Sequence, residues 1–159
     1  MPTLRKACAT KDCSMRSIRG MIFSSEARVG RGVHVPTITP RNESSAHPRF
    51  PSLESVLGPG RNLQETWVDL VGSARAQRFL VAAHYDPALP VNEALRKISP
   101  DIEWRGDLIV MRAGTWVFVT DVGAQALAVR AVQKYLRKCS EVVATATARG
   151  LPIELPVLV

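Results

Sequence analysis

His84, in the stretch AHYDP, is the residue best suited to acid–base chemistry. Alternate residues of a strand share a face, so a strand here would place Asp86 on the same side as His84. A carboxylate that orients an imidazole is a common arrangement for a general base. No serine stands in a strained strand-to-helix turn, and Cys139 falls on the apolar stripe of an expected helix. A capping or core histidine is therefore preferred, and a hydrolase-like enzyme centred on His84/Asp86 is the third hypothesis.

A second group of residues is cationic and lies on the outer side of an expected helix over residues 123–148. Arg130, Lys134, Arg137 and Lys138 recur there at helical spacing. Such a stripe could neutralise a few phosphates, which predicts weak, salt-sensitive anion or nucleic-acid binding without base recognition. The alternative is an ordinary solvated helix face. A nucleic-acid-associated accessory protein that uses a basic arm and this basic face is the second hypothesis.

The cysteines and histidines predict no metal site and no cofactor. Cys8 and Cys13 lack nearby histidine partners for a four-ligand zinc site, and three cysteines, an odd number, argue against a disulfide framework. Free thiols are typical of a reducing compartment, so an intracellular location, cytoplasmic or nuclear, is expected. The first 31 residues hold seven basic and two acidic residues, so a mitochondrial presequence is the alternative. No apolar run is long enough for a membrane span.

Composition predicts one folded domain. The chain has 159 residues, 46% of them hydrophobic, and a net charge of +7. Residues 33–60 hold five prolines, which disfavour a helix and suggest an irregular connector. We therefore expect residues 1–60 to form a basic, Pro/Ser-rich arm, disordered or loosely docked, and residues 61–159 to form the domain.

Hydrophobic periodicity predicts the elements of that domain. A helix is expected from Asn62, with Glu65 completing a capping box. Residues 79–83 read as a strand with both faces covered, followed by a short helix that Asn92 caps and Pro100 ends. Apolar runs on both sides of Ala113-Gly114 predict a hairpin over residues 108–120. The long helix over residues 123–148 comes next, and the last residues form an edge strand.

These elements define the expected fold class, an α+β domain with a small three- to four-stranded mixed sheet, a central hairpin and two main covering helices. The hairpin is apolar on both faces, which favours a partner on one of them. The first hypothesis is therefore a non-catalytic module that acts through protein–protein association, with self-association included. Its expected interface residues are Trp116, Phe118, Val157 and Leu158.

Overall fold

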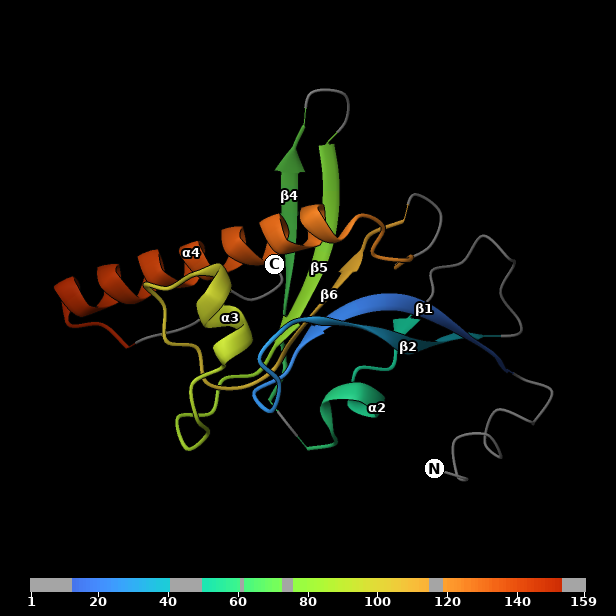
Figure 1. Ribbon diagram of the computed structural model, residues 1–159, viewed down its shortest axis with the longest axis horizontal. Coiled ribbons are helices and arrows are strands. Elements are labelled where there is room, and N and C mark those ends of the chain that lie inside the picture. Colours follow the sequence, from blue (N-terminus) through green and yellow to red (C-terminus); the bar gives the residue numbers. More distant parts are fainter. Residues whose placement is uncertain (1–12, 41–49, 61, 73–75, 115–118, 153–159) are drawn as a thin grey trace.

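The computed structural model describes residues 13–40, 50–60, 62–72, 76–114 and 119–152. Six antiparallel strands form one curled sheet, a half-barrel, in the order β3-β2-β1-β6-β5-β4 (Figure 1). The strands are β1 (Cys13–Phe23), β2 (Arg31–Pro40), β3 (Phe50–Pro51), β4 (Gln64–Val71), β5 (Ala76–Ala83) and β6 (Leu108–Arg112). The helices are α2 (Glu54–Leu57), α3 (Glu93–Ile98) and α4 (Gln125–Arg149). The expected three- to four-stranded mixed sheet under two main helices is wrong, because six strands and one long helix are observed among these residues.

The β1–β2 hairpin corrects the expectation of a disordered or loosely docked arm. β1 lies inside the sheet, between β2 and β6, and buries Ile18 and Ile22. Pro36 is compatible with β2 because its carbonyl oxygen accepts from the Ser52 N–H, on the side away from β1. Its nitrogen faces the same way, so the missing N–H removes no bond from the β1–β2 ladder. The prolines therefore did not exclude a strand here.

β4 corrects the helix expected from Asn62. Thr66, Val68 and Leu70 are buried while the residues between them are half-buried or exposed, which is a period of two. Strand geometry puts alternate residues on opposite faces, and β-branched residues such as Thr66 and Val68 favour it. The helix was predicted because Leu63, Trp67, Leu70, Val71 and Ala74 recur at helical spacing, and periodicity alone therefore misassigned this segment.

Only part of the hairpin expected over residues 108–120 lies within the described residues. β6 pairs with β1 on one side and with β5 on the other, so a return strand does not occupy the centre of the sheet. Thr120 forms an isolated bridge with Arg112. Residues 115–118, which include Trp116 and Phe118, lie outside the described residues. The central hairpin of the expected fold is therefore wrong.

Three other sequence predictions are confirmed. β5 is the expected strand, and its residues 79–83 are all buried. Asn92 caps α3 by accepting from the Leu95 N–H. α4 ends at Arg149 and is capped by Gly150, whose φ of 63° is the left-handed geometry of a helix C-terminus.

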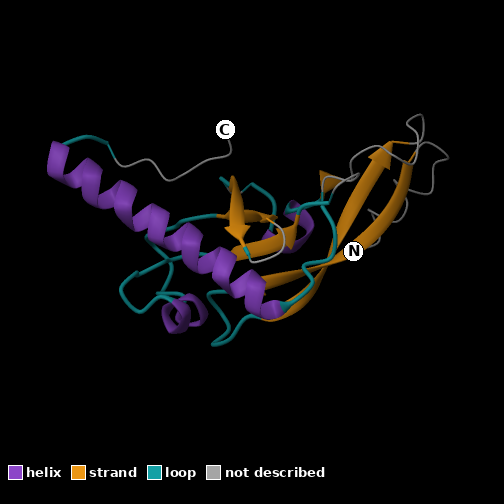
Figure 2. Ribbon diagram, turned by 90° about the horizontal axis from the view of Figure 1, so that it is seen from above, coloured by secondary structure: helices purple, strands orange, loops and turns teal. Residues whose placement is uncertain are grey.

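α4 packs one face of the sheet and then extends beyond it. Ala128, Val132, Leu136 and Cys139 are buried, on the inner stripe that the sequence predicts. A helix of 25 residues is about 37 Å long. Figures 1 and 2 show that it crosses the β4 end of the sheet and projects past it.

The core lies on both faces of the sheet, which explains why β5 and β6 are apolar throughout. The α4 face includes Phe79, Val81, Leu108 and Val110. The opposite face is covered by α2 and closed by the curl of the sheet. Its buried residues are Ile18, Ile22, Val35, Leu53, Leu57, Leu80, Ala82, Ile109, Met111 and Val119. No helix in the described part of the chain has the length and hydropathy needed to cross a membrane.

Candidate functional site

The candidate site is the outer edge of β4, the last strand in the described sheet. β4 pairs with β5 on its inner side, and Asp69 lies opposite Arg78. The Arg78 carbonyl oxygen accepts from the Ala113 N–H at 2.8 Å, so the backbone groups of Arg78 face away from β4. In an antiparallel ladder its partner then also faces away, so the N–H and C=O of Asp69 point outward. Alternation along the strand gives Glu65 and Val71 the same outward orientation.

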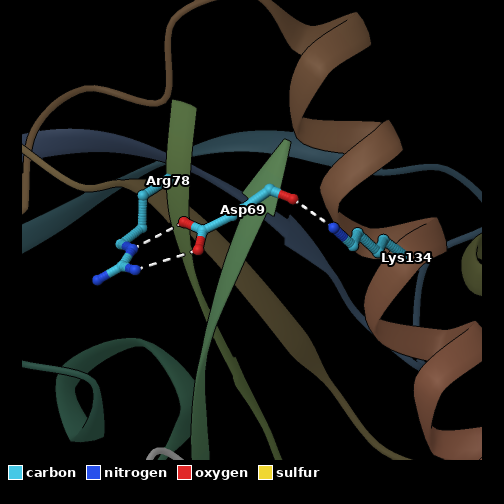
Figure 3. Close-up of polar contacts among 3 residues, drawn as sticks. All are labelled: Asp69, Arg78 and Lys134. Atoms are coloured by element: carbon cyan, nitrogen blue, oxygen red, sulfur yellow. Dashed lines mark hydrogen bonds and ion pairs between the residues drawn. The ribbon is translucent and has the colours of Figure 1, made fainter. Parts of the chain in front are cut away.

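Lys134 reaches this edge from α4. Its Nζ donates to the carbonyl oxygen of Asp69 at 2.5 Å (Figure 3). The contact marks the place where the helix crosses the edge strand, because it joins a residue in the middle of α4 to a residue near the end of β4. It also covers one outward acceptor of β4. A lysine beside a sheet edge is one of the devices by which proteins limit edge-to-edge pairing.

Asp69 and Arg78 form a bidentate ion pair on the other side of the strand. Arg78 Nε lies 2.7 Å from Asp69 Oδ1, and Nη2 lies 3.1 Å from Oδ2. The hydrogen bond from Arg78 lowers the pKa of Asp69; burial acts in the opposite direction, and the charges of Arg78 and Lys134 add to the lowering. The side chains are 49% and 55% exposed, so solvent screens the pair and its contribution to stability is small. The guanidinium also lies 5.8 Å from the centre of the Trp67 ring.

The predicted cationic residues are all exposed on α4, namely Arg130, Lys134, Arg137 and Lys138. The structure gives them different surroundings. Lys134 is held at the edge of β4, whereas Arg137 lines a depression between α4 and the segment after α3. The four cations therefore do not act as one uniform surface.

His84 is placed as a structural residue rather than in an exposed site. It is 5% exposed, and its Nδ1 accepts from the Asp107 N–H at 3.3 Å. Asp86 accepts from the Ala88 N–H through Oδ1 at 2.9 Å, as in a turn. Burial raises the pKa of the Cys139 thiol to about 11, so this thiol is protonated near neutral pH and is a poor nucleophile.

Some expected site residues cannot be placed. Trp116, Phe118, Val157 and Leu158 lie outside the described residues, so their predicted role in an interface stays a prediction. Within the described ranges, no group of three or more His, Cys, Asp or Glu side chains could hold a metal ion.

Sequence reasoning missed the edge itself. The available signal was the alternation in residues 64–71, where Thr66, Val68 and Leu70 share one face. Because this segment was assigned to a helix, the outward backbone groups of a sheet edge were not predicted. The contact between Lys134 and Asp69 was not predicted either.

Comparisons with protein-family models, with curated proteins and with solved structures find no match to this chain. Its function is therefore inferred from the geometry at β4.

Proposed function

We propose that this protein is a non-catalytic module that binds another protein by accepting an extended strand at the outer edge of β4. The observation that carries the proposal is the outward direction of the backbone groups of Glu65, Asp69 and Val71 on the last described strand of the sheet. Backbone hydrogen bonds to a sheet edge are an established mode of peptide recognition. Val71 is 80% exposed, so the far end of this edge is accessible.

The projection of α4 favours a single strand over a second copy of the chain. An antiparallel pairing of β4 with β4 of another copy has a two-fold axis normal to the sheet, so both α4 helices would lie on the same face. Each α4 helix would project across the shared edge into the space of the other. Two packed helices need about 8–10 Å between their axes. A single strand needs only about 4.8 Å beside β4. We therefore propose an extended segment of a different protein as the partner.

Peptide selection on the full chain tests this proposal. Random nonapeptides displayed on phage are selected against the protein, and the affinities of the selected peptides are measured for the wild type, Glu65→Pro and Glu65→Thr. Proline removes the outward N–H but no bond to β5, and threonine removes the carboxylate while keeping that N–H. We expect Glu65→Pro to bind at least about tenfold more weakly, since at least one edge hydrogen bond is lost. Glu65→Thr should bind within about twofold of the wild type.

Two further measurements make the result specific. Thermal unfolding must show that both variants are folded, and hydrogen exchange of the Asp69 amide should slow when peptide is bound. Selection of no peptide, or equal binding by the two variants, would contradict strand addition. A stable dimer in light scattering whose dissociation follows Val157→Asp and Leu158→Asp would instead support self-association through the end of the chain.

A further inference from the structure

The position of Lys134 leads to an inference about the chemistry of the partner, which rests on the proposed function. We infer that the segment added to β4 is acidic, and that its carboxylate takes the Lys134 ammonium when the segment pairs with the strand. Lys134 then disfavours the pairing of neutral or basic strands with β4 and recognises acidic ones.

The Lys134–Asp69 hydrogen bond supplies the first step. The ammonium occupies the outward carbonyl of Asp69, which is an acceptor that an added strand would use. An incoming backbone N–H competes with it for this oxygen, and where the N–H takes its place the ammonium is displaced. The ammonium, a donor with no acceptor capacity, then needs a new partner. A neutral strand leaves it to water alone, whereas a strand with Asp or Glu at this place gives it a charge-assisted hydrogen bond.

The neighbouring charges supply the second step. Arg130 and Lys138 lie one helical turn before and after Lys134, so the three cations follow one ridge of α4. All three are exposed. The acidic residues nearby do not cancel this ridge, because the Asp69 carboxylate is already paired with Arg78 and Glu141 lies at the far end of the ridge. The charge beside the edge therefore favours an anionic partner.

Glu65 limits where the acidic residue of the partner lies. It stands four residues before Asp69 on the same outward-facing register, about 13 Å along the strand. A carboxylate opposite Glu65 or Asp69 would lie beside their carboxylates on the face away from α4, whereas one opposite Val68 or Leu70 lies on the α4 face, from which Lys134 reaches the edge (Figure 3). The preferred position is thus near the α4 crossing.

Three synthetic nonapeptides of alternating threonine and valine provide the test, with the central residue Asp, Asn or Lys. Binding of each is measured by fluorescence anisotropy to the full-length wild type, Lys134→Glu and Arg31→Glu. Arg31 is exposed on β2, four strands from β4 in the sheet, so it is a matched charge reversal away from the edge. The salt concentration is varied because exposed ion pairs are screened.

We expect the wild type to bind the Asp peptide about tenfold more tightly than the Asn peptide at low salt, with the difference shrinking at high salt. Lys134→Glu should reverse the order and prefer the Lys peptide, and Arg31→Glu should keep the order of the wild type. Equal binding of Asp and Asn peptides, or an unchanged order in Lys134→Glu, would overturn the inference.

The failure of this inference is distinguishable from the failure of strand addition. If all three peptides bind equally and Glu65→Pro weakens all of them, strand addition stands and only the acidic preference is wrong. If none binds, the proposed function fails as well. Single-stranded oligothymidine is included as a competitor: displacement of the Asp peptide by it, with a steep salt dependence lost in Lys134→Glu, would show that the ridge serves nucleic acid instead.

Discussion

Gly106 packs directly against the main chain of His84. A Cβ atom at position 106 would overlap the His84 carbonyl oxygen and lie 3.1 Å from its carbonyl carbon. The φ of Gly106 is +127°, a region that residues with side chains rarely adopt. Beside this contact, the His84 N–H donates to the Asp107 carbonyl at 3.2 Å, which joins the end of β5 to the entrance of β6. The close approach therefore requires glycine.

Gly106→Ala is expected to lower the free energy of unfolding by more than about 3 kcal/mol, because overlap and an unfavourable φ act together. Urea denaturation followed by circular dichroism measures the change. Gly32→Ala is the matched control, since a Cβ at that exposed position meets nothing within 4 Å. It should change stability by no more than about 0.5 kcal/mol. Similar losses in the two variants would contradict the role given to Gly106.

Asn92 connects three separate parts of the chain through one buried side chain. Its Nδ2 donates to the carbonyls of Phe23 and Gly106 at 3.0 and 2.8 Å, and its Oδ1 accepts from the Leu95 N–H. Asn92→Ala removes a helix cap and leaves two buried carbonyls short of a donor, so a loss of about 3 kcal/mol is expected in urea denaturation. Asn92→Ser keeps a capping oxygen and should recover about 1 kcal/mol of it. Equal stability of the two variants would show that the cap contributes nothing.

The sequence predicted the elements whose signals are local. Asn92 and Pro100 bound α3, and Gly150 ends α4, because capping and chain reversal depend on a few neighbouring residues. The sheet order could not be predicted in the same way. β1 pairs with β6 across more than 80 positions of sequence, and nothing in the sequence of either strand specifies the other as its partner.

The candidate site also combines a feature that the sequence predicts with a feature that depends on the tertiary fold. Lys134 was singled out for its charge, but its contact with Asp69 depends on β4 being a strand and on α4 crossing it. Periodicity gave β4 the wrong element, since Trp67 and Leu70 satisfy a helical stripe as well as a strand. The alternation in residues 64–71 could have identified the strand, but its place at the edge depends on the sheet order, which sequence patterns do not give.

Cys139 and Tyr135 predict a loss of stability in alkali. Burial raises the pKa of the Cys139 thiol from 9.0 to about 11 and also raises the pKa of Tyr135. Above pH 9 the unfolded chain loses the thiol proton while the folded chain keeps it, so the unfolded state binds fewer protons and stability falls as pH rises. Between pH 8 and 10.5 the Cys139 thiol is expected to lower the free energy of unfolding by about 2 kcal/mol.

Urea denaturation at the two pH values measures this loss. Cys139→Ala is the control, because it removes the buried thiol and leaves Cys8 and Cys13 in place. Its stability should fall less between pH 8 and 10.5 than that of the wild type. An identical fall would show that the thiol of Cys139 does not determine the alkaline behaviour.

The Asp69–Arg78 pair predicts a small effect in acid. The hydrogen bond from Arg78 holds the pKa of Asp69 below its ordinary value of 3.8. The pair therefore stabilises the fold above that pH, and its contribution is lost as pH falls through the lower folded value. A double-mutant cycle with Asp69→Asn and Arg78→Met, measured by urea denaturation at pH 7, in acid and in high salt, isolates the coupling. We expect a coupling that is well below the effect of Asn92→Ala and that shrinks with salt, because both side chains are about half exposed. A coupling as large as the loss in Asn92→Ala, and insensitive to salt, would mean that the pair is shielded from solvent, and the β4 edge would then be covered rather than accessible to a partner.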